Sequence, residues 1–257
     1  MAIAHRGGAK LRPENTLVAF AHALSIGVDA IECDVRLSKD AQPVVIHDET
    51  LDRTTNCSGP VSAFTAEELA HIDAGHHFGP AEGFPFRVRG VGVPRLADVL
   101  TLSAEVPIIV EIKGEDAAAV GPVVDAIAAA GAAGRVVIAG FSHAVLSAVR
   151  RRAPGLVTSA SQTEVISALR WSYVWWAPRQ PAFQLVQAPL QLRGRRVLSR
   201  SLVRALRRAG LPVQAWIVDE IDDMQRVLDW GVTGLITDRP DRALTVIRER
   251  TTPRTES

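Results

Sequence analysis

Acidic and basic side chains occur in pairs within two short apolar runs of the sequence. Glu32 and Asp34 lie two positions apart in the first run, and Glu111 and Lys113 lie two positions apart in the second. Alternate side chains of a β-strand point to the same face, so each pair is expected to share one face of its strand. Two carboxylates on one face of a buried strand cannot both stay ionised unless positive charge neutralises them.

The three carboxylates predict a site for one divalent cation, Mg²⁺ or Ca²⁺. Glu32, Asp34 and Glu111 offer oxygen ligands, with no Cys or His facing the same way, and such ligands suit hard ions rather than Zn²⁺. Cys33 faces the other side of its strand and is expected to pack in the core. If either strand is considered alone, its charged residues could instead form a structural ion pair, for example between Glu111 and an arginine. The repetition of the pattern on two strands favours the cation.

Two histidines each end a short apolar run. His5 follows Ala2-Ile3-Ala4, and His47 follows Val44-Val45-Ile46. Histidine titrates near neutral pH, so such a pair could accept and donate protons in one reaction. Arg6 and Lys113 add positive charge beside the expected cation, which favours an anionic substrate, with phosphate the leading candidate. Together these residues predict a site that cleaves phosphodiesters.

The elements that must position these residues alternate along the chain. The expected strands are Ala2–His5, Ala30–Val35, Val44–His47, Ile108–Lys113, Val136–Ala139, Val157–Ala160, Phe183–Gln187, Val213–Val218 and Gly234–Thr237. The expected helices are Asn15–Ser25, Thr65–His71, Leu96–Leu102, Ala117–Ala130, His143–Arg152, Glu164–Trp171, Arg200–Ala209, Ile221–Asp229 and Asp241–Arg250.

About eight strand–helix units in 257 residues predict an α/β fold, the (β/α)8 TIM barrel. Strands joined by helices are parallel, and barrels keep their catalytic residues at the carboxyl ends of the strands. Residues 51–93 are expected to form a small insertion after the second strand. Two domains are the alternative from length alone, but no linker interrupts the chain. A doubly wound sheet is also disfavoured, because Gly90-Val91-Gly92 is not followed by a third glycine.

Charge and composition exclude other classes of protein. The 29 Lys and Arg residues nearly balance the 28 Asp and Glu residues, so a uniformly basic nucleic-acid-binding domain is not expected. Two cysteines without a CxxC pattern predict neither a disulfide scaffold nor a zinc site. The sequence shows no signal-peptide pattern and no uncharged stretch of the roughly 20 residues that a membrane span needs, which predicts a cytoplasmic protein. A GxSxG serine-hydrolase motif is also absent.

An ordered set of motifs resembles the bacterial glycerophosphodiester phosphodiesterase family, within the phospholipase-C-like phosphodiesterase barrels. The motifs are Ala4–Gly8, Arg12–Thr16, Ile31–Val35, Val45–Asp48, Leu51–Thr55, Val93–Leu96, Val110–Lys113, Gln214–Val218 and Gly231–Pro240. The resemblance implies one barrel domain over residues 1–257 that hydrolyses glycerophosphodiesters to sn-glycerol 3-phosphate and an alcohol.

The resemblance also implies roles for individual residues. The positions matching Glu32, Asp34 and Glu111 hold the cation, those matching His5 and His47 are the acid–base pair, and those matching Arg6, Lys113 and Trp216 contact phosphate or substrate. Where the family often has Trp-Thr-Val-Asn, this chain has Trp216-Ile217-Val218-Asp219, which leaves the role of Asp219 open. The alternative activity is that of a lysophospholipase-D-like enzyme acting on lysophospholipids. A non-enzymatic barrel that binds phosphodiesters is disfavoured, because the metal and histidine positions are all filled.

Two further patterns receive weaker interpretations. Arg200, Arg204, Arg207 and Arg208 share one face of an expected helix, which is typical of a solvated outer helix rather than a membrane-docking surface. The aromatic cluster Trp171, Tyr173, Trp175 and Trp176 is expected to serve packing rather than to line an entrance for lipid. A small-molecule substrate is the expected partner. Membrane contact is not favoured, and the sequence leaves the oligomeric state open.

Overall fold

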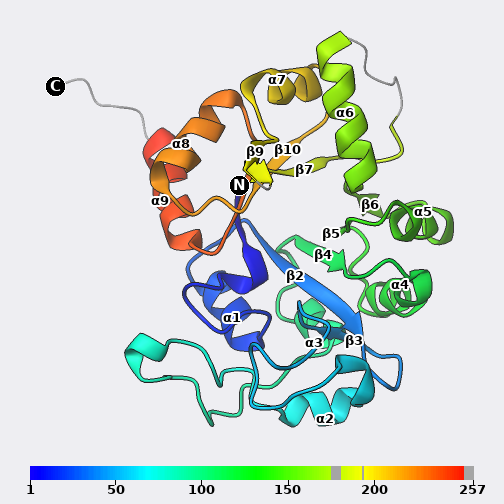
Figure 1. Cartoon of the computed structure of the whole chain (residues 1–257), viewed down its shortest axis with the longest axis vertical. Helices are drawn as coiled ribbons and strands as arrows, with labels where there is room; N and C mark the ends of the chain where they lie inside the picture. The colour runs from blue at the N-terminus through cyan, green and yellow to red at the C-terminus, as the bar shows by residue number, and fades with distance from the viewer. Residues whose placement is uncertain (175–180, 193, 252–257) are drawn as a thin grey trace.

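Eight parallel strands form a closed barrel in the computed structural model (Figure 1). The structure describes residues 1–174, 181–192 and 194–251, except for the side chains of residues 170–174, 195 and 196. The barrel strands are β1 (Ala2–Ala4), β2 (Ala30–Leu37), β4 (Ile108–Ile112), β5 (Val136–Ala139), β6 (Val157–Thr158), β7 (Val186–Pro189), β10 (Val213–Trp216) and β11 (Gly234–Thr237). Their order in the sheet is β6-β5-β4-β2-β1-β11-β10-β7. A parallel bridge between Ser159 and Leu185 joins the two ends and closes the ring.

Helices surround the strands, as the alternating pattern predicts (Figure 1). The α-helices are α1 (Leu17–Ser25), α2 (Ala66–His71), α3 (Leu96–Thr101), α4 (Val120–Ala129), α5 (His143–Arg152), α6 (Gln162–Val174), α7 (Arg200–Arg208), α8 (Ile221–Trp230) and α9 (Pro240–Thr251). The short 3-10 helices are η1 (His5–Gly7), η2 (Val61–Ala63), η3 (Pro80–Glu82) and η4 (Ala117–Ala119). The order of strands and helices is that of a (β/α)8 TIM barrel, which confirms the expected fold.

The alternation of side chains along β2 separates the core from the barrel interior. Ile31, Cys33 and Val35 pack in the outer hydrophobic cluster between the sheet and the helices. Glu32 and Asp34 point the other way, and both are buried. The expectation that Cys33 faces away from the two carboxylates is therefore confirmed.

One expected strand differs from the sequence-based prediction. Residues Val44–His47 do not form a barrel strand, because β3 (Pro43–Val45) pairs antiparallel with β2 and ends before His47. Chain reversal within so few residues allows only antiparallel pairing, since a parallel crossover needs a dozen or more residues. His47 is therefore carried by the segment that follows β3 and leads into the insertion.

The insertion after the second barrel strand has a small hydrophobic cluster of its own. Leu51, Val61 and Leu69 are buried in this cluster together with Ile46, which precedes His47. The packing of the insertion thus reaches the segment that carries one of the two histidines.

The strand expected at Phe183–Gln187 is shifted along the chain, and two further patterns of the sequence can be compared with the structure. The observed strand β7 begins three residues later, at Val186, and ends two residues later, at Pro189. The arginines of α7 are exposed while Leu202, Val203 and Leu206 are buried, as expected for an outer helix. The aromatic cluster at residues 171–176 lies outside the described side chains. Within the described ranges, none of the helices has the length and apolar character needed to cross a membrane.

Gly92 is expected to be essential for the packing of the insertion. A Cβ at this position would lie 1.9 Å from the carbonyl oxygen of Ala70 in α2, which is backbone and cannot move aside cheaply. Gly92→Ala should therefore lower the free energy of unfolding by about 1–3 kcal/mol, as overpacking does. Gly155 has open space around it and no positive φ, so Gly155→Ala should change stability by less than about 1 kcal/mol. Equal thermal midpoints for the two variants would contradict this account.

Candidate active site

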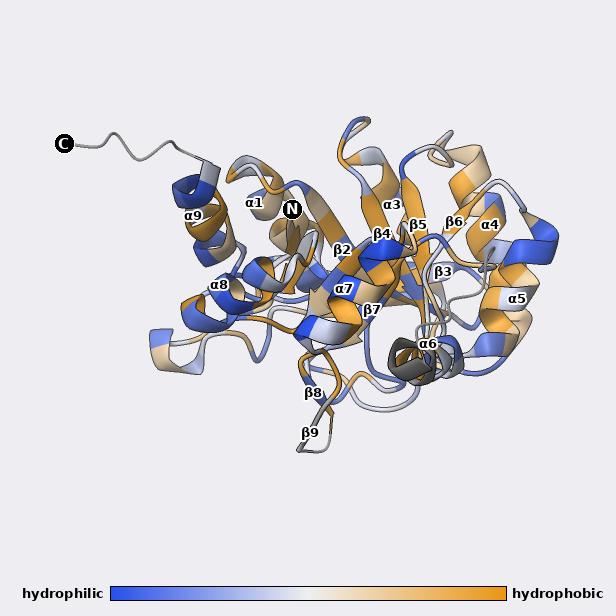
Figure 2. Cartoon of the chain, turned by 90° about the horizontal axis from the view of Figure 1, so that it is seen from above, coloured by the Kyte–Doolittle hydropathy of each residue, from blue (hydrophilic) through white to orange (hydrophobic). Residues whose placement is uncertain are grey.

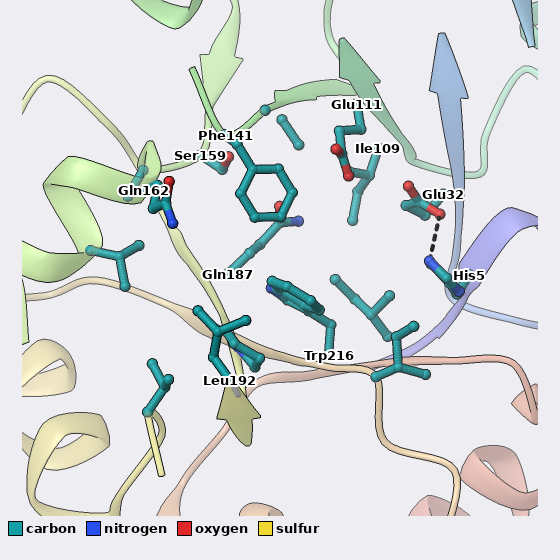
Figure 3. Close-up of a pocket in the computed structure, with 18 of the residues that line it drawn as sticks. His5, Glu32, Ile109, Glu111, Phe141, Ser159, Gln162, Gln187, Leu192 and Trp216 are labelled. Carbon is teal, nitrogen blue, oxygen red and sulfur yellow. Dashed lines mark ion pairs between the residues drawn. The ribbon is translucent and has the colours of Figure 1, made fainter. Parts of the chain in front are cut away.

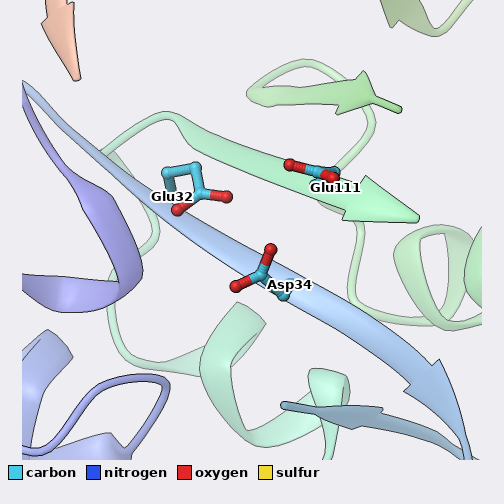
Figure 4. A group of neighbouring side chains, drawn as sticks. All are labelled: Glu32, Asp34 and Glu111. Carbon is cyan, nitrogen blue, oxygen red and sulfur yellow. The ribbon is translucent and has the colours of Figure 1, made fainter. Parts of the chain in front are cut away.

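Three carboxylates from two adjacent strands converge inside the barrel mouth. Glu32 and Asp34 come from β2 and Glu111 from β4, and the register pairs Asp34 with Glu111 (Figure 4). Each offers a ligand atom, and these atoms lie within 4.8 Å of one another. Glu32 and Asp34 are 4% and 1% exposed. The structure thus brings together the three residues that the sequence proposes as metal ligands.

Two cationic side chains lie directly against this cluster. Lys113 Nζ is 2.8 Å from Glu111 Oε1 and 3.1 Å from Asp34 Oδ1. Arg6 Nε is 3.0 Å from Asp34 Oδ2. Asn15 completes the surroundings of Asp34, because its side-chain amide donates to Asp34 Oδ2 at 2.8 Å. The ion pair considered as an alternative for Glu111 therefore exists, but it is made by Lys113 rather than by an arginine.

Two cationic side chains cannot balance the charge of three carboxylates, of which Glu32 and Asp34 are buried and Glu111 half-buried, and Glu32 is the group left without a balancing charge. Burial and the neighbouring Asp34 charge raise the pKa of Glu32 to about 8. For Asp34, burial also acts to raise the pKa, but Lys113 and Arg6 outweigh it, so its pKa is lowered. The cluster needs one more positive charge near neutral pH.

The donor set fits a divalent cation. All three groups are carboxylates, the ligands that Mg²⁺ and Ca²⁺ prefer, and a bound ion would supply the charge that Glu32 lacks. Asp34 Oδ1 lies 3.1 Å from Lys113 Nζ but accepts no aligned hydrogen bond among the described residues, so it keeps lone-pair capacity for a cation. The composition of the cluster does not distinguish Mg²⁺ from Ca²⁺.

His5 is held in position by the end of the last barrel strand. It begins the short helix η1, and its Nδ1 lies 2.6 Å from Asp238 Oδ1. Burial lowers the pKa of His5, but the Glu32 charge and the Asp238 hydrogen bond outweigh burial and raise it overall. Asp219 accepts hydrogen bonds from Thr237 Oγ1 and from the Asp238 backbone N–H. Asp219 therefore fixes the segment that holds His5.

His47, which lines the same pocket, has the same kind of partner as His5. Its Nδ1 lies 2.6 Å from Asp48 Oδ1, and Arg36 Nε donates to its backbone carbonyl at 2.8 Å. The pKa of Asp48 is lowered to about 2, chiefly by a hydrogen bond from Arg53. Arg53 also donates to Glu14, whose other partner is Arg6. A continuous polar network thus connects the surroundings of the two histidines.

One pocket exposes these groups together. His5, His47, Glu32 and Glu111 all line it, as do Arg6 and Lys113. Figure 3 shows His5, Glu32 and Glu111 on one side of the pocket and Phe141, Leu192 and Trp216 on the other. The Trp216 ring meets the Phe141 ring edge to face at 5.8 Å. Trp216, which only the resemblance indicates, therefore lies within this pocket.

Several residues that organise the site were not assigned a role from the sequence. Asp238 and Asp48 orient the histidines, and Asn15 and Glu14 surround Asp34 and Arg6. All four lie in motifs shared with the resembled family, and Asp48 directly follows His47. Asp238 is 233 residues from His5, so only the closure of the barrel brings the two together.

A barrel mouth with buried carboxylates, paired histidines and cationic side chains defines the site of a phosphodiester hydrolase. Comparison with known proteins gives the particular family. The model of the glycerophosphoryl diester phosphodiesterase family matches residues 5–242. A glycerophosphodiester phosphodiesterase from Caldanaerobacter subterraneus is 35% identical, with 97% of this chain and 98% of the relative covered. One from Bacillus altitudinis is 33% identical, with 96% and 97% covered.

Solved structures agree with the sequence relatives. The crystal structure of a glycerophosphodiester phosphodiesterase from Agrobacterium tumefaciens has a TM-score of 0.76 and 28% identity, with 95% of this chain and 98% of that chain covered. The chain belongs to the glycerophosphoryl diester phosphodiesterase family and is a phosphoric diester hydrolase.

The charge deficit at Glu32 predicts an unusual dependence of stability on pH. A carboxyl with a folded pKa near 8, against an ordinary value of 4.5, keeps its proton only in the folded state over that range. Stability should therefore fall as pH rises from about 5 to 8 in the presence of EDTA. Glu32→Gln removes the ionisable group, so its thermal midpoint should fall less over the same range.

The Glu32→Gln variant should also lose the stabilisation that a divalent cation gives. Added Mg²⁺ or Ca²⁺ should raise the thermal midpoint of the unaltered protein at pH 8, by about 2–4 °C for each kcal/mol of stabilisation from ion binding. Glu32→Gln should respond weakly to either ion. Differential scanning fluorimetry across pH, with EDTA or with either ion, measures both effects. Parallel pH curves for the two proteins in EDTA would contradict the charge argument.

Proposed function

We propose that this protein hydrolyses glycerophosphodiesters to sn-glycerol 3-phosphate and an alcohol, using one divalent cation and the histidine pair. The observation that carries the proposal is the convergence of Glu32, Glu111, His5 and His47 on a single pocket. The names of the relatives, which cover nearly the whole chain, support the same substrate class.

The proposed cation is held by Glu32, Asp34 and Glu111. Such an ion neutralises charge on the phosphate and lowers the pKa of a bound hydroxyl. Arg6 and Lys113, which line the same pocket, keep further positive charge beside it and favour an anionic substrate. The carboxylates of the cluster hold both cationic side chains in place through ion pairs.

The two histidines supply the proton transfers. One takes the proton from the attacking hydroxyl, which is either a water molecule, giving glycerol 3-phosphate directly, or the 2-hydroxyl of the glycerol. The other donates a proton to the alkoxide that leaves as the phosphorus–oxygen bond breaks. Attack by the 2-hydroxyl gives a cyclic phosphate, which a water molecule then opens to glycerol 3-phosphate in a second step with the roles of the two histidines reversed. A carboxylate can only accept a hydrogen bond, so Asp238 and an ionised Asp48 favour Nδ1–H on both histidines and direct Nε2 toward other partners. The symmetry of these contacts leaves the assignment of acid and base open.

Release of glycerol 3-phosphate from glycerophosphocholine tests the activity and its metal dependence. Full-length protein is treated with EDTA, and Mg²⁺ or Ca²⁺ is then restored. We expect EDTA to abolish the release and one of the two ions to restore it, because Glu32 needs a cation to ionise. Release that continues unchanged in EDTA would contradict the metal proposal while leaving the substrate class intact.

Replacing either histidine should remove one proton transfer. His5→Ala and His47→Ala should each lower kcat by about 10²–10⁴, the usual contribution of a general acid or base. His71 is an exposed histidine of the insertion whose Nδ1 bonds within its own helix, so His71→Ala is the matched control and should keep full activity. Near-normal turnover in His5→Ala or His47→Ala would remove that residue from the mechanism.

A further inference from the structure

His5 and His47 are attached to the barrel in different ways. His5 directly follows β1, which pairs with a barrel strand on each side, β2 and β11. The barrel strands are largely hydrophobic, and the helices lie around them (Figure 2). His47 instead follows β3, which pairs with β2 off the path of the barrel strands. The side chain of His47 is 30% exposed, against 11% for His5. The barrel strands alone therefore do not fix the ring of His47.

The ring of His47 is oriented by Asp48, which is itself held by Arg53. Asp48 Oδ1 lies 2.6 Å from His47 Nδ1, and the other carboxylate oxygen, Oδ2, accepts a hydrogen bond from Arg53 Nε at 2.5 Å. Each oxygen of the carboxylate thus has one of the two partners. The position of Arg53 therefore sets the direction in which Asp48 faces the imidazole.

Arg53 is fixed in turn by a carboxylate that is mostly buried. The two terminal nitrogens of its guanidinium donate to the two oxygens of Glu14 at 2.7 and 2.8 Å, and such a two-bond pairing fixes the plane of the group. Glu14 is 16% exposed and also accepts a hydrogen bond from Arg6 at 2.8 Å. Burial acts to raise the pKa of Glu14, but Arg53 and Arg6 outweigh it, so the pKa is lowered and the group stays ionised. Glu14 therefore ties Arg53 to the turn that follows β1.

The backbone that carries Arg53 is a packed turn of the insertion. The backbone N–H of Thr55 donates to the carbonyl of Leu51 at 3.1 Å, and the N–H of Leu51 donates to the carbonyl of Gly59 at 3.0 Å. Leu51 and Thr55 are 0% and 1% exposed, and Leu51 belongs to the hydrophobic cluster of the insertion. The side chain of Arg53 thus starts between two buried residues and completes a path from Glu14 to His47.

This path acts on the pocket only through other residues. His47 and Arg6 line the pocket, but the residues behind them, Asp48, Arg53 and Glu14, are not among the described residues that do so. The contribution of Arg53 is also one of direction rather than of charge. The pKa of Asp48 is about 2, but an ordinary aspartate, with a pKa of about 3.9, is equally ionised at neutral pH.

We propose that Arg53 is a positioning residue of the reaction, through which the insertion holds the His47 ring in its productive orientation by way of Asp48. The inference rests on the proposed function, in which His47 transfers a proton. Proton transfer requires the imidazole nitrogen to lie within hydrogen-bond reach of the reacting oxygen, and a misplacement of about 1 Å can cost about 10²-fold in rate. The whole guanidinium is required, because one nitrogen bonds Asp48 while the other two bond Glu14. A lysine ammonium offers no such planar set of donors.

Steady-state kinetics of Arg53→Gln and Arg53→Lys test the inference. The substrate is glycerophosphocholine, with metal-loaded full-length protein well below the thermal midpoint of the least stable variant. We expect kcat to fall at least about tenfold in both variants, because His47 loses its orientation whether or not the charge is kept. KM should stay within about threefold, because Arg6 retains Asp34 as a partner. Arg89 is an exposed arginine of the same insertion, so Arg89→Gln is the matched control and should keep kcat within about twofold.

The same substitution in a His47→Ala background shows whether Arg53 acts through His47. We expect Arg53→Gln to lower kcat by less than about threefold in this background, because the group that it positions is gone. A residue that contacts the phosphate directly, or that only supports the fold, would instead lower kcat as much as it does in the unaltered protein.

The tautomer of His47 gives a readout that does not depend on activity. Correlation of imidazole protons with nitrogens by NMR distinguishes Nδ1–H from Nε2–H, and the His47→Ala variant identifies the signals of His47. Spectra are recorded at about pH 9, above the ordinary histidine pKa of about 6.5. We expect His47 to carry Nδ1–H in the unaltered protein and in Arg89→Gln, and to become a mixture of tautomers in Arg53→Gln, where Asp48 is no longer held.

The other outcomes contradict the inference. An unchanged kcat or an unchanged His47 spectrum in Arg53→Gln overturns it, and full activity in Arg53→Lys overturns the requirement for the guanidinium. A rise in KM of more than about tenfold, or a loss of kcat that persists in the His47→Ala background, overturns it in favour of direct contact with the substrate or of general support. If the unaltered protein hydrolyses no glycerophosphodiester, the proposed function fails, and the spectra still decide whether Arg53 orients His47.

Discussion

The concentration of negative charge inside the barrel mouth is the constraint on which the site depends. Three carboxylates from adjacent strands face two cationic side chains, and burial removes the water that would otherwise solvate them. Asp34 ionises because Lys113 and Arg6 lie beside it, and the deficit then falls on Glu32, whose pKa rises to about 8. A fold that buries this cluster gives up stability at neutral pH, which a divalent cation would restore. This loss of stability is explained if the cation takes part in the function.

Because the negative charge is concentrated in this way, each of the two cationic side chains has two roles. Lys113 and Arg6 neutralise carboxylates, and both also line the pocket. Arg6 adopts a positive φ of 51°, and its backbone N–H donates to Glu32 while its side chain reaches Asp34 and Glu14. Gly7 follows because a Cβ there would lie 2.7 Å from Cβ of Ala19. The short turn after β1 therefore links charge balance, packing against α1 and the placement of His5.

Local patterns in the sequence were sufficient for the barrel and for the charged centre of the site. Side-chain alternation placed Glu32 and Asp34 inward and Cys33 outward, since it requires only that β2 be a strand buried on both faces. Prediction failed where a contact depends on chain reversal or on barrel closure. The run ending at His47 looked like a barrel strand, but tight reversal made it an antiparallel partner of β2. Asp238 could not be paired with His5, because 233 residues separate them.

The two histidines make equivalent hydrogen bonds but are held in place by different parts of the structure. Nδ1 of each histidine lies 2.6 Å from a carboxylate oxygen, which favours Nδ1–H on both, so the proposed acid and base are oriented in the same way and differ in whether Nε2 carries a proton. His5 is anchored between the first and last barrel strands and is mostly buried. His47 lies beyond β3, is more exposed, and depends on Arg36 and on the packing of the insertion. Glu32 Oε2 also lies 4.0 Å from His5 Nε2, so His5 directly adjoins a carboxylate that is proposed to hold the cation. Because the Glu32 charge helps to raise the pKa of His5, a cation bound by Glu32 would weaken that effect.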